Sequence, residues 1–266
     1  MSKKRLDQLL FEHSLAESRE RAKALIMEGI VYVNGVKENK PGSQIAEDSV
    51  IEVKGNTLPY VSRGGLKLEK ALKIFEVDPK GKKCIDCGAS TGGFTDVLLQ
   101  NGAELVYAVD VGYGQLAWKL RNDPRVINLE RTNVRYIDHE TVPDVIDLAV
   151  MDASFISVKL LLPAVSALLS DDADLICLIK PQFEAGRERV GKKGVVKDRQ
   201  THIDVIKDIV GFAPSVGLYP FELDFSPVKG PEGNIEYLCH MRKTFCQFRQ
   251  NIENVVDRSH LELDQV

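Results

Sequence analysis

Four residues that lie far apart in the sequence combine two amines with two carboxylates. They are Lys67, Asp152, Lys180 and Glu236, and three of them stand within or at the end of a short apolar run typical of a β-strand. Polar groups project at the carboxyl ends of the strands of a parallel sheet, so the four could meet at one edge. A neutral lysine can act as a base, and a carboxylate can orient it. The four residues are therefore candidates for proton-transfer chemistry.

The two lysines affect each other only if folding brings them together. Burial and a neighbouring cation both lower the pKa of a lysine, which favours the neutral amine that a base requires. An ion pair with Asp152 would instead favour a charged ammonium group. The sequence leaves this balance open. Each of the four residues taken singly also has a structural interpretation, as a surface side chain, a helix cap or a group at the solvated side of a strand.

A glycine-rich turn, Asp-x-Gly-x-x-x-Gly-Gly over residues 86–93, follows the strand expected at Cys84–Cys87. Such a turn lets a ligand approach the backbone closely, and its spacing differs from the Gly-x-Gly-x-x-Gly turn that holds a dinucleotide pyrophosphate. Asp110 stands at the end of the next expected strand, where an acidic residue can accept both hydroxyls of a ribose. The pattern favours a ligand site. The alternative is a turn that only packs a helix against the sheet.

The length of 266 residues allows one small and one large domain. Residues 1–58 predict two helices, at 5–13 and 18–28, then a strand at 30–33, a hairpin turn at Asn34-Gly35 and a strand at 49–53. Ser18 is the expected N-cap of the second helix and Gly29 its end. A polar connector, Gly55–Pro59, separates this module from the second domain, residues 59–266.

From residue 60 onward helices and strands alternate, which predicts an α/β fold with a doubly wound, mostly parallel sheet. Strands are expected at 84–87, 105–110, 126–129, 148–151 and 175–179, and helices at 65–75, 93–101, 115–121, 158–169 and 201–210. Segments 218–225 and 235–241 predict two neighbouring strands that add an antiparallel edge. Residues 244–266 resemble a polar tail that is helical in part, over 249–256.

Composition narrows the classes of function. The five cysteines and five histidines show no metal-ligand spacing, so no metal site is expected. The cysteine usage suits a reducing compartment, no secretory signal follows the N-terminus, and no apolar run is long enough to span a bilayer. A cytoplasmic location without a membrane role is expected.

The formal net charge of −4 counts against nucleic-acid binding, but the charge is unevenly distributed. Residues 63–83 and 180–199 each carry seven basic and three acidic side chains. Local basic patches decide contact with phosphate, although a solvated charged surface is the alternative. Three glycines, at 186, 191 and 194, predict that residues 185–199 form a mobile loop able to close over RNA.

Three features of the sequence resemble those of known protein families. The order Lys-Asp-Lys-Glu resembles the catalytic tetrad of FtsJ-type ribose 2′-O-methyltransferases, and the turn at 86–93 resembles the S-adenosylmethionine motif of class I methyltransferases. Residues 3–55 resemble the small RNA-binding domain of a ribosomal small-subunit protein. Together, over about residues 3–243, the chain resembles the TlyA family, and Val61-Ser-Arg-Gly-Gly-Leu-Lys67 is the most specific stretch.

The resemblance implies a class I, Rossmann-like methyltransferase domain joined to a small α+β RNA-binding domain. It implies 2′-O-methylation of cytidine in 16S or 23S ribosomal RNA, with ribosomal RNA or ribosomal subunits as partners. Lys180 would be the base, Asp152 would orient it, and Lys67 and Glu236 would fix the ribose hydroxyl. The S-adenosylmethionine cofactor would contact Asp86, Gly88, Ser90, Gly92, Gly93, Phe94, Asp110 and Asn133. In particular, Asp86 would order the turn and face the methionine end, and Asn133 would touch the adenine edge. RNA would contact Lys4, Arg5, Arg19, Arg21, Lys23 and Arg63.

Alternatives from other classes stay open. One is a non-catalytic RNA-binding protein that retains a methyltransferase shell, against which the complete set of four residues argues. Another is a haemolysin or cytolysin, a name that some members of the family carry. A methyltransferase acting on small molecules is disfavoured by the N-terminal module.

Overall fold

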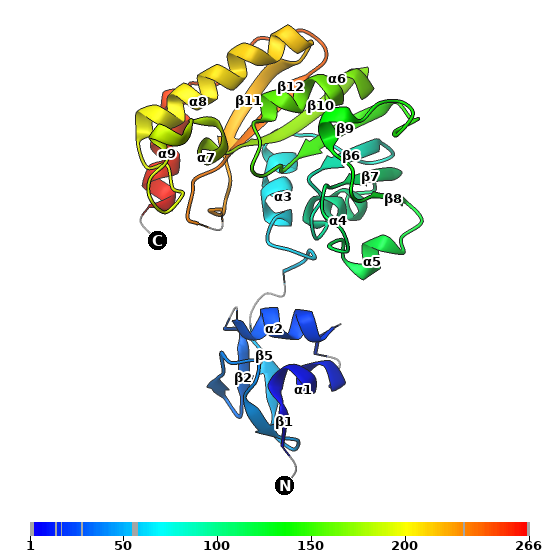
Figure 1. The fold of residues 1–266 in the computed structure, drawn as a ribbon, viewed down its shortest axis with the longest axis vertical. Helices are drawn as coiled ribbons and strands as arrows, with labels where there is room; N and C mark the ends of the chain where they lie inside the picture. The colour runs from blue at the N-terminus through cyan, green and yellow to red at the C-terminus, as the bar shows by residue number, and fades with distance from the viewer. Residues whose placement is uncertain are drawn as a thin grey trace. The chain divides into compact units, whose positions relative to one another are not determined.

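The computed structural model describes residues 3–13, 15–16, 18–27, 29–54, 58–230 and 232–264. The chain divides into two compact units, Met1–Pro59 and Tyr60–Val266 (Figure 1). Within the expected connector Gly55–Pro59, residues 55–57 lie outside the described part of the chain, as does Glu28 at the expected end of the second helix.

The first unit is an α+β module. Its core contains the apolar sides of both helices and the start of the strand at Val31–Val33, and it includes Leu6, Leu10, Leu25, Ile26 and Val31. β1 pairs antiparallel with β4, and β3, β2 and β5 form a second antiparallel sheet. The elements are β1 (Lys3–Arg5), α1 (Leu6–Glu12), α2 (Arg19–Met27), β2 (Val31–Val33), β3 (Val36–Lys37), β4 (Gln44–Ala46) and β5 (Ile51–Val53).

Local signals in the sequence explain most of this module. The Ser18 side chain accepts a hydrogen bond from the Arg21 backbone N–H at 3.1 Å, as expected of an N-cap. Asn34 and Gly35 have φ of 50° and 78°, the left-handed pair that a two-residue hairpin requires. β1 and β4 were not predicted, because Lys3–Arg5 contains only charged residues and Gln44–Ala46 has a single β-branched residue, unlike the valine-rich β2.

The second unit is built on a 7-stranded sheet with the order β11-β12-β10-β9-β6-β7-β8. Neighbouring strands from β10 to β8 are parallel, whereas β12 runs antiparallel to β10 and β11 on either side of it. The strands are β6 (Lys83–Cys87), β7 (Leu105–Val109), β8 (Val126–Leu129), β9 (Ile146–Met151), β10 (Leu169–Ile179), β11 (Tyr219–Phe225) and β12 (Tyr237–Arg242). The predicted mostly parallel sheet with an antiparallel edge is confirmed, and the antiparallel strand itself lies second from the edge.

Helices cover both faces of the sheet, as the alternation of buried side chains shows. In β6, Cys84 packs with α3 and α4, whereas Ile85 and Cys87 pack with α6, α8 and α9 on the opposite face. The result is a three-layer α/β/α arrangement. The helices are α3 (Gly65–Ile74), α4 (Gly93–Gln100), α5 (Trp118–Arg121), α6 (Leu162–Leu168), α7 (Pro181–Glu184), α8 (Arg199–Phe212) and α9 (Ile252–Leu263). Short 3₁₀ turns are η1 (Val134–Tyr136), η2 (Val158–Leu160), η3 (Arg187–Arg189) and η4 (Ala213–Val216).

Three elements differ from the prediction. The helix expected over 115–121 is only the single turn α5, and the one expected over 158–169 divides into η2 and α6. The expected polar tail is instead a structural part of the domain: α9 starts later than predicted and packs against α8 and β11 (Figure 1). Its apolar side chains Ile252, Val255 and Val256 are buried in the core. Ile252, Val255 and Val256 have the i, i+3, i+4 spacing of a buried helix face, but the many polar residues around them made residues 244–266 resemble a solvated tail.

The buried side of α9 predicts a measurable contribution to stability. Val256 is 0% exposed, and Val256→Ala removes two methyl groups from the core, so it should lower the free energy of unfolding by about 2 kcal/mol. Leu261 on the same helix is 62% exposed, and Leu261→Ala should cost less than about 0.5 kcal/mol. Urea denaturation of both variants measures the difference. Equal effects would mean that α9 does not pack against the core.

Candidate active site

The four candidate catalytic residues meet at one edge of the sheet. Asp152 directly follows β9 and Lys180 directly follows β10, so both stand at the carboxyl ends of parallel strands. Glu236 directly precedes β12, and because β12 is antiparallel, its start lies at this same edge. Lys67 reaches the site from the first turn of α3. Residues separated by up to 169 positions are thereby brought into contact.

Asp152 is the link between the two lysines. Its Oδ1 lies 2.6 Å from Lys180 Nζ, and its Oδ2 accepts from Lys67 Nζ at 3.3 Å. Lys67 Nζ also donates to Glu236 Oε2 at 2.6 Å. Lys180 Nζ donates in addition to Ser154 Oγ at 2.9 Å. The four side chains therefore form one connected chain of alternating charge.

Burial makes these charges interact strongly. Lys67, Lys180 and Glu236 are 8%, 6% and 1% exposed. Burial alone would favour the neutral form of Lys67, but Asp152 and Glu236 outweigh it and raise the pKa of this lysine above its ordinary value. Burial would likewise raise the pKa of Asp152, yet Lys180 and Lys67 together lower it. The site thus holds Lys67 as an ammonium ion and Asp152 as a carboxylate.

Close backbone packing explains the sequence just before Lys67. A Cβ on Gly65 would lie 2.6 Å from the Tyr60 ring, and a Cβ on Gly93 would lie 2.3 Å from Ser62 Oγ. The two glycines therefore let the start of α3 lie against the start of α4. This contact fixes the direction in which Lys67 leaves its helix.

A cavity of about 480 Å³ opens beside the tetrad, within the size range of ligand sites. It is lined by Gly88, Ser90, Asp110, Val111, Gln115, Asn133, Val134, Asp152, Ala153, Ser154, Phe155, Ile156 and Leu161. Gly88 has φ of 91°, and a Cβ there would lie 2.8 Å from the backbone oxygen of Asp152. Glycine at this position lets β6 and β9 approach each other at the point where the strand order reverses.

The polar groups of the cavity are held in fixed positions. Asp110 Oδ2 accepts from the Ser90 backbone N–H at 2.8 Å, and Asp110 Oδ1 accepts from that of Gly112 at 2.6 Å. Each oxygen of this carboxylate keeps further accepting capacity, and Asp110 lines the cavity. Asn133 Oδ1 accepts from the Arg135 backbone N–H at 3.0 Å, which fixes the Asn133 side chain at the start of η1.

Four other residues expected at the cofactor do not line this cavity; they are Asp86, Gly92, Gly93 and Phe94. Asp86 is fully buried below the turn and orders it, because its Oδ2 accepts from the backbone N–H and the hydroxyl of Thr95 at 2.9 and 2.7 Å. Asp86 Oδ1 is buried without a hydrogen-bond partner among the residues that the structure describes. Gly92 has φ of 93° and packs beneath Leu120, where a Cβ would lie 2.2 Å from Leu120 Cδ1.

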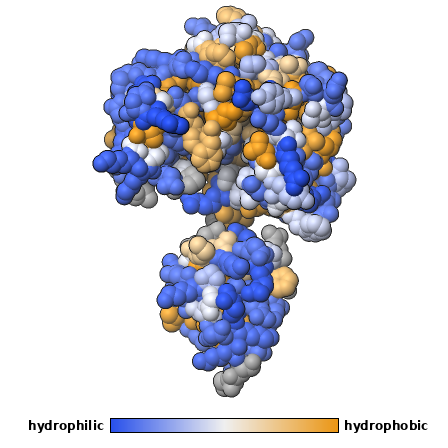
Figure 2. Space-filling model, in the orientation of Figure 1, coloured by the Kyte–Doolittle hydropathy of each residue, from blue (hydrophilic) through white to orange (hydrophobic). Residues whose placement is uncertain are grey.

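The sequence did not single out two residues next to the tetrad. Ser154 accepts a hydrogen bond from Lys180, and Phe155 is 90% exposed, has φ of 65° and packs at a tilt against Phe183, with a centroid distance of 5.1 Å. On the face shown in Figure 2, apolar residues are exposed in the middle of the larger unit and hydrophilic residues lie on both sides of them. The only signal in the sequence was that Ser154 and Phe155 follow Asp152 by two and three positions, and a single residue in a loop has no periodicity that reveals it.

Comparison with known proteins agrees with this geometry. Residues 60–243 match the FtsJ-like methyltransferase family, and residues 4–51 match the S4 domain. The chain is 44% identical over 239 residues to a protein of Mycobacterium tuberculosis named 16S/23S rRNA (cytidine-2′-O)-methyltransferase TlyA, with 90% of this chain and 89% of that protein covered. This chain is an FtsJ-like methyltransferase of the TlyA family.

Other TlyA-family relatives carry a different name. Hemolysin A of Brachyspira hyodysenteriae is 43% identical, with 89% of this chain and 98% of that protein covered. A solved structure from Streptococcus thermophilus, described as a candidate hemolysin, has a TM-score of 0.79 and 46% identity, and it covers 100% of this chain and 98% of that one. No helix among the described residues is both long enough and apolar enough to cross a membrane. The described side chains also include no group of three or more His, Cys, Asp or Glu residues placed to hold a metal ion.

Three basic residues of the S4 domain form ion pairs with acidic residues of the same domain. Arg5 Nε and Arg19 Nη2 bind the two oxygens of Asp7, which is fully buried, at 2.9 and 3.1 Å. The hydrogen bond from Arg5 helps to lower the pKa of Asp7. Lys4 pairs with Glu12 at 2.9 Å. Arg5 and Arg19 therefore stabilise the module as well as presenting charge.

The remaining predicted RNA contacts fall in both units. Arg21 and Lys23 are partly exposed on α2, and Arg63 is exposed in the turn before α3. Arg63 is thus a candidate contact close in sequence to Lys67, whereas the other five belong to the S4 domain.

The burial of Asp86 predicts a pH-dependent stability. Burial raises the pKa of Asp86 to about 7, against hydrogen bonds from Thr95 that lower it. The folded protein therefore keeps a proton that the unfolded chain has lost between pH 4 and 7. The stability that Asp86 contributes is fully present below about pH 4 and is lost as the pH rises through 7.

Asp86→Asn keeps this site neutral at every pH. The free energy of unfolding of Asp86→Asn, relative to the natural chain, should therefore rise by about 1.4 kcal/mol per pH unit between pH 4 and 7. Urea denaturation across this range measures it, and Asp172→Asn at an exposed site should show no such trend. A difference that is independent of pH would contradict the raised pKa of Asp86.

Proposed function

We propose that this enzyme transfers a methyl group from S-adenosylmethionine to the ribose 2′-hydroxyl of a cytidine in 16S or 23S ribosomal RNA. One observation carries the proposal: Asp152 lines the cavity and also contacts both lysines of the tetrad. A methyl donor bound in the cavity and a ribose hydroxyl held at the tetrad would thus both lie next to Asp152. The names of two relatives support the substrate, since TlyA proteins of Mycobacterium tuberculosis and Campylobacter jejuni are named rRNA (cytidine-2′-O)-methyltransferases.

The residues of the cavity fit this cofactor. Asp110 can accept the two ribose hydroxyls, Asn133 offers an amide to the adenine edge, and Val111, Val134 and Ile156 supply apolar walls. S-adenosylmethionine, when bound, supplies a methyl group made electrophilic by the sulfonium. Gly88 and Ser90 line the end of the cavity that follows β6, where the backbone of the turn is open to close approach.

The asymmetry of the tetrad supports Lys180 as the base. Lys67 contacts two carboxylates, and its raised pKa keeps it protonated, so it has no lone pair free to accept the hydroxyl proton. Lys180 contacts one carboxylate, Asp152, which it shares with Lys67. We therefore assign the hydroxyl proton to Lys180 Nζ, and Asp152 and Ser154 orient that amine.

Lys67 would act as a fixed positive charge. Its ammonium group lies beside Asp152 at the same edge and can stabilise the negative charge that develops on the attacking oxygen. Glu236, which is almost fully buried, keeps Lys67 charged and in place. In this proposal Lys180 accepts the proton and Lys67 stabilises the developing negative charge.

The S4 domain supports an RNA substrate, since the matched family takes its name from a ribosomal protein and a uS4 protein of Finegoldia magna is 44% identical over 50 residues. Lys4, Arg5, Arg19, Arg21 and Lys23 bring five positive charges to this small unit. Phosphate contacts by such residues supply affinity without reading base sequence. We assign this domain to holding the RNA while the second unit carries out the transfer.

Removal of the base should stop the reaction. Lys180→Ala should lower kcat by about 10²- to 10⁴-fold, because the hydroxyl loses its proton acceptor, while affinity for S-adenosylmethionine changes less than about threefold. Transfer of radiolabelled methyl to ribosomal subunits from a strain that lacks the protein measures the first quantity, and calorimetry measures the second. Lys207→Ala, which removes a surface lysine paired with Glu253, is the matched control and should keep full activity. Full activity of Lys180→Ala would exclude this base.

The charges on α2 should matter to RNA affinity and not to cofactor affinity. The double variant Arg21→Ala and Lys23→Ala should weaken RNA binding and reduce the slope of log K against log salt by about 1 to 2, since each phosphate contact contributes about 0.7 to 0.9. Lys54→Ala, at a lysine paired with Glu52 at 2.8 Å, is the control for charge in the same domain. Filter binding at four salt concentrations gives both slopes. An unchanged slope in the double variant would show that α2 does not contact RNA.

A further inference from the structure

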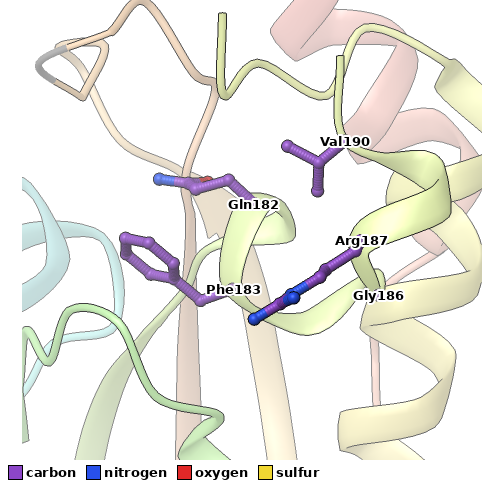
Figure 3. A pocket seen from close by; sticks show the side chains of 5 residues that line it. All are labelled: Gln182, Phe183, Gly186, Arg187 and Val190. Carbon is purple, nitrogen blue, oxygen red and sulfur yellow. The ribbon is translucent and has the colours of Figure 1, made fainter. Parts of the chain in front are cut away.

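A second cavity, of about 350 Å³, lies next to the tetrad and shares no lining residue with the first. Figure 3 shows the residues that line it: Gln182, Phe183, Gly186, Arg187 and Val190. They come from α7, which begins directly after Lys180, and from the segment that follows it. The Phe183 ring connects the two sites, since its centroid lies 5.8 Å from Lys180 Nζ.

The cavity combines three kinds of group that recognise a nucleotide. Gln182 offers an amide, which pairs with the edge of a base, and Phe183 offers a ring on which a base can stack. Arg187 offers a guanidinium, whose fork of donors matches a phosphate. Gln182 and Phe183 project from α7 toward the same side in Figure 3, with Arg187 beside them.

Two of these groups lack partners within the described part of the chain. Gln182 Oε1 is buried and accepts no hydrogen bond there. A buried acceptor without a partner is uncommon in a folded protein and calls for an explanation, and here it belongs to a side chain that lines the cavity. Arg187 is exposed and forms no ion pair with any described residue, whereas Arg189 and Arg199 in the same basic segment are paired with Asp204 and Asp257.

The walls of the cavity are held in place from behind. Glu184 Oε2 accepts from Ser157 Oγ at 2.6 Å, and its Oε1 accepts from the Val158 backbone N–H at 2.8 Å, which fixes α7 against the segment after β9. Asn234 holds the other end of the basic segment, through Val196 N and the Gly194 oxygen at 3.0 and 2.9 Å. The backbone that carries the lining residues is therefore held at both ends of this segment before any ligand arrives.

We propose that this cavity binds the nucleotide adjacent to the methylated one in the RNA strand. Its base would stack on Phe183 with an edge at the Gln182 amide, and its phosphate would contact Arg187. The inference rests on the proposed function, because it places the acceptor ribose at Lys180. The short distance from Phe183 to Lys180 then puts the next nucleotide of the same strand within reach of the cavity. Recognition of a splayed, single-stranded base by an aromatic ring and an amide is the usual mode for RNA.

A thermodynamic cycle between protein and RNA tests this subsite directly. Fragments of ribosomal RNA are prepared with a single abasic site at successive positions, and their Kd values for the full-length protein are measured by fluorescence anisotropy. On intact RNA, Phe183→Leu should raise Kd by about 5- to 100-fold, the range of a lost base stack. When the abasic site is next to the methylated ribose, Phe183→Leu should change Kd less than about twofold, because the base is already missing. Gln182→Leu should follow the same pattern.

Two controls separate this subsite from general effects. Lys192→Ala removes one exposed charge from the same segment and should weaken binding by an equal factor on intact and abasic RNA. Phe245→Leu replaces a ring that is 78% exposed elsewhere on the unit and should leave all Kd values unchanged. Unchanged S-adenosylmethionine affinity and melting temperature show that each variant is folded.

The binding measurements and the methyl-transfer assay test the nucleotide subsite and the proposed reaction separately. If Phe183→Leu weakens binding to every abasic RNA by the same factor as to intact RNA, or weakens binding to none, the subsite is wrong even when methyl transfer is normal. If the natural chain transfers no methyl group, the proposed reaction fails. The cycle still decides the subsite in that case, because it measures binding alone and one abasic position must abolish the effect of Phe183→Leu.

Discussion

The structure depends on one buried carboxylate that two lysine side chains share. Asp152 contacts Lys180 through one oxygen and Lys67 through the other, and Glu236 completes the charge balance on Lys67. Each charge would be costly to bury alone, so each requires its neighbours. The ends of β9 and β10, the start of β12 and the first turn of α3 are consequently held at one point.

This requirement gives a reason for the sheet topology. A parallel strand at the position of β12 would place its carboxyl end here, and the residue before it would lie at the opposite edge. Because β12 runs antiparallel between β10 and β11, Glu236 at its start reaches the same edge as Asp152 and Lys180. Tyr237, the next residue, bonds His202 and Ser259 and so ties this strand to α8 and α9. The C-terminal helix thereby supports the strand that positions Glu236.

The sequence predicted most of the fold because its signals are local. The glycine turn after β6, the Asn34-Gly35 hairpin and the apolar strand runs each reflect the conformation of a few neighbouring residues. The resemblance to the FtsJ-type tetrad indicated which four residues would meet, and the expected places of Asp152 and Lys180 at strand ends implied a common edge for these two. The sequence could not predict that Asp86 lies below the turn, that Asp7 engages Arg5 and Arg19, or that Phe155 and Phe183 pack against each other beside the tetrad. Arg19–Asp7 and Phe155–Phe183 join residues of different elements, and a single residue has no pattern that identifies its partner.

The charge state of Lys67 is the most direct test of this account. Nuclear magnetic resonance of ¹⁵N-labelled lysine side chains, with Lys67→Arg to assign the signal, follows the Nζ atom as the pH is raised. We expect Lys67 to remain an ammonium ion beyond its ordinary pKa of 10.5, because Asp152 and Glu236 outweigh the effect of burial. Loss of its proton below that value would contradict the shared-carboxylate arrangement and the division of roles between the two lysines.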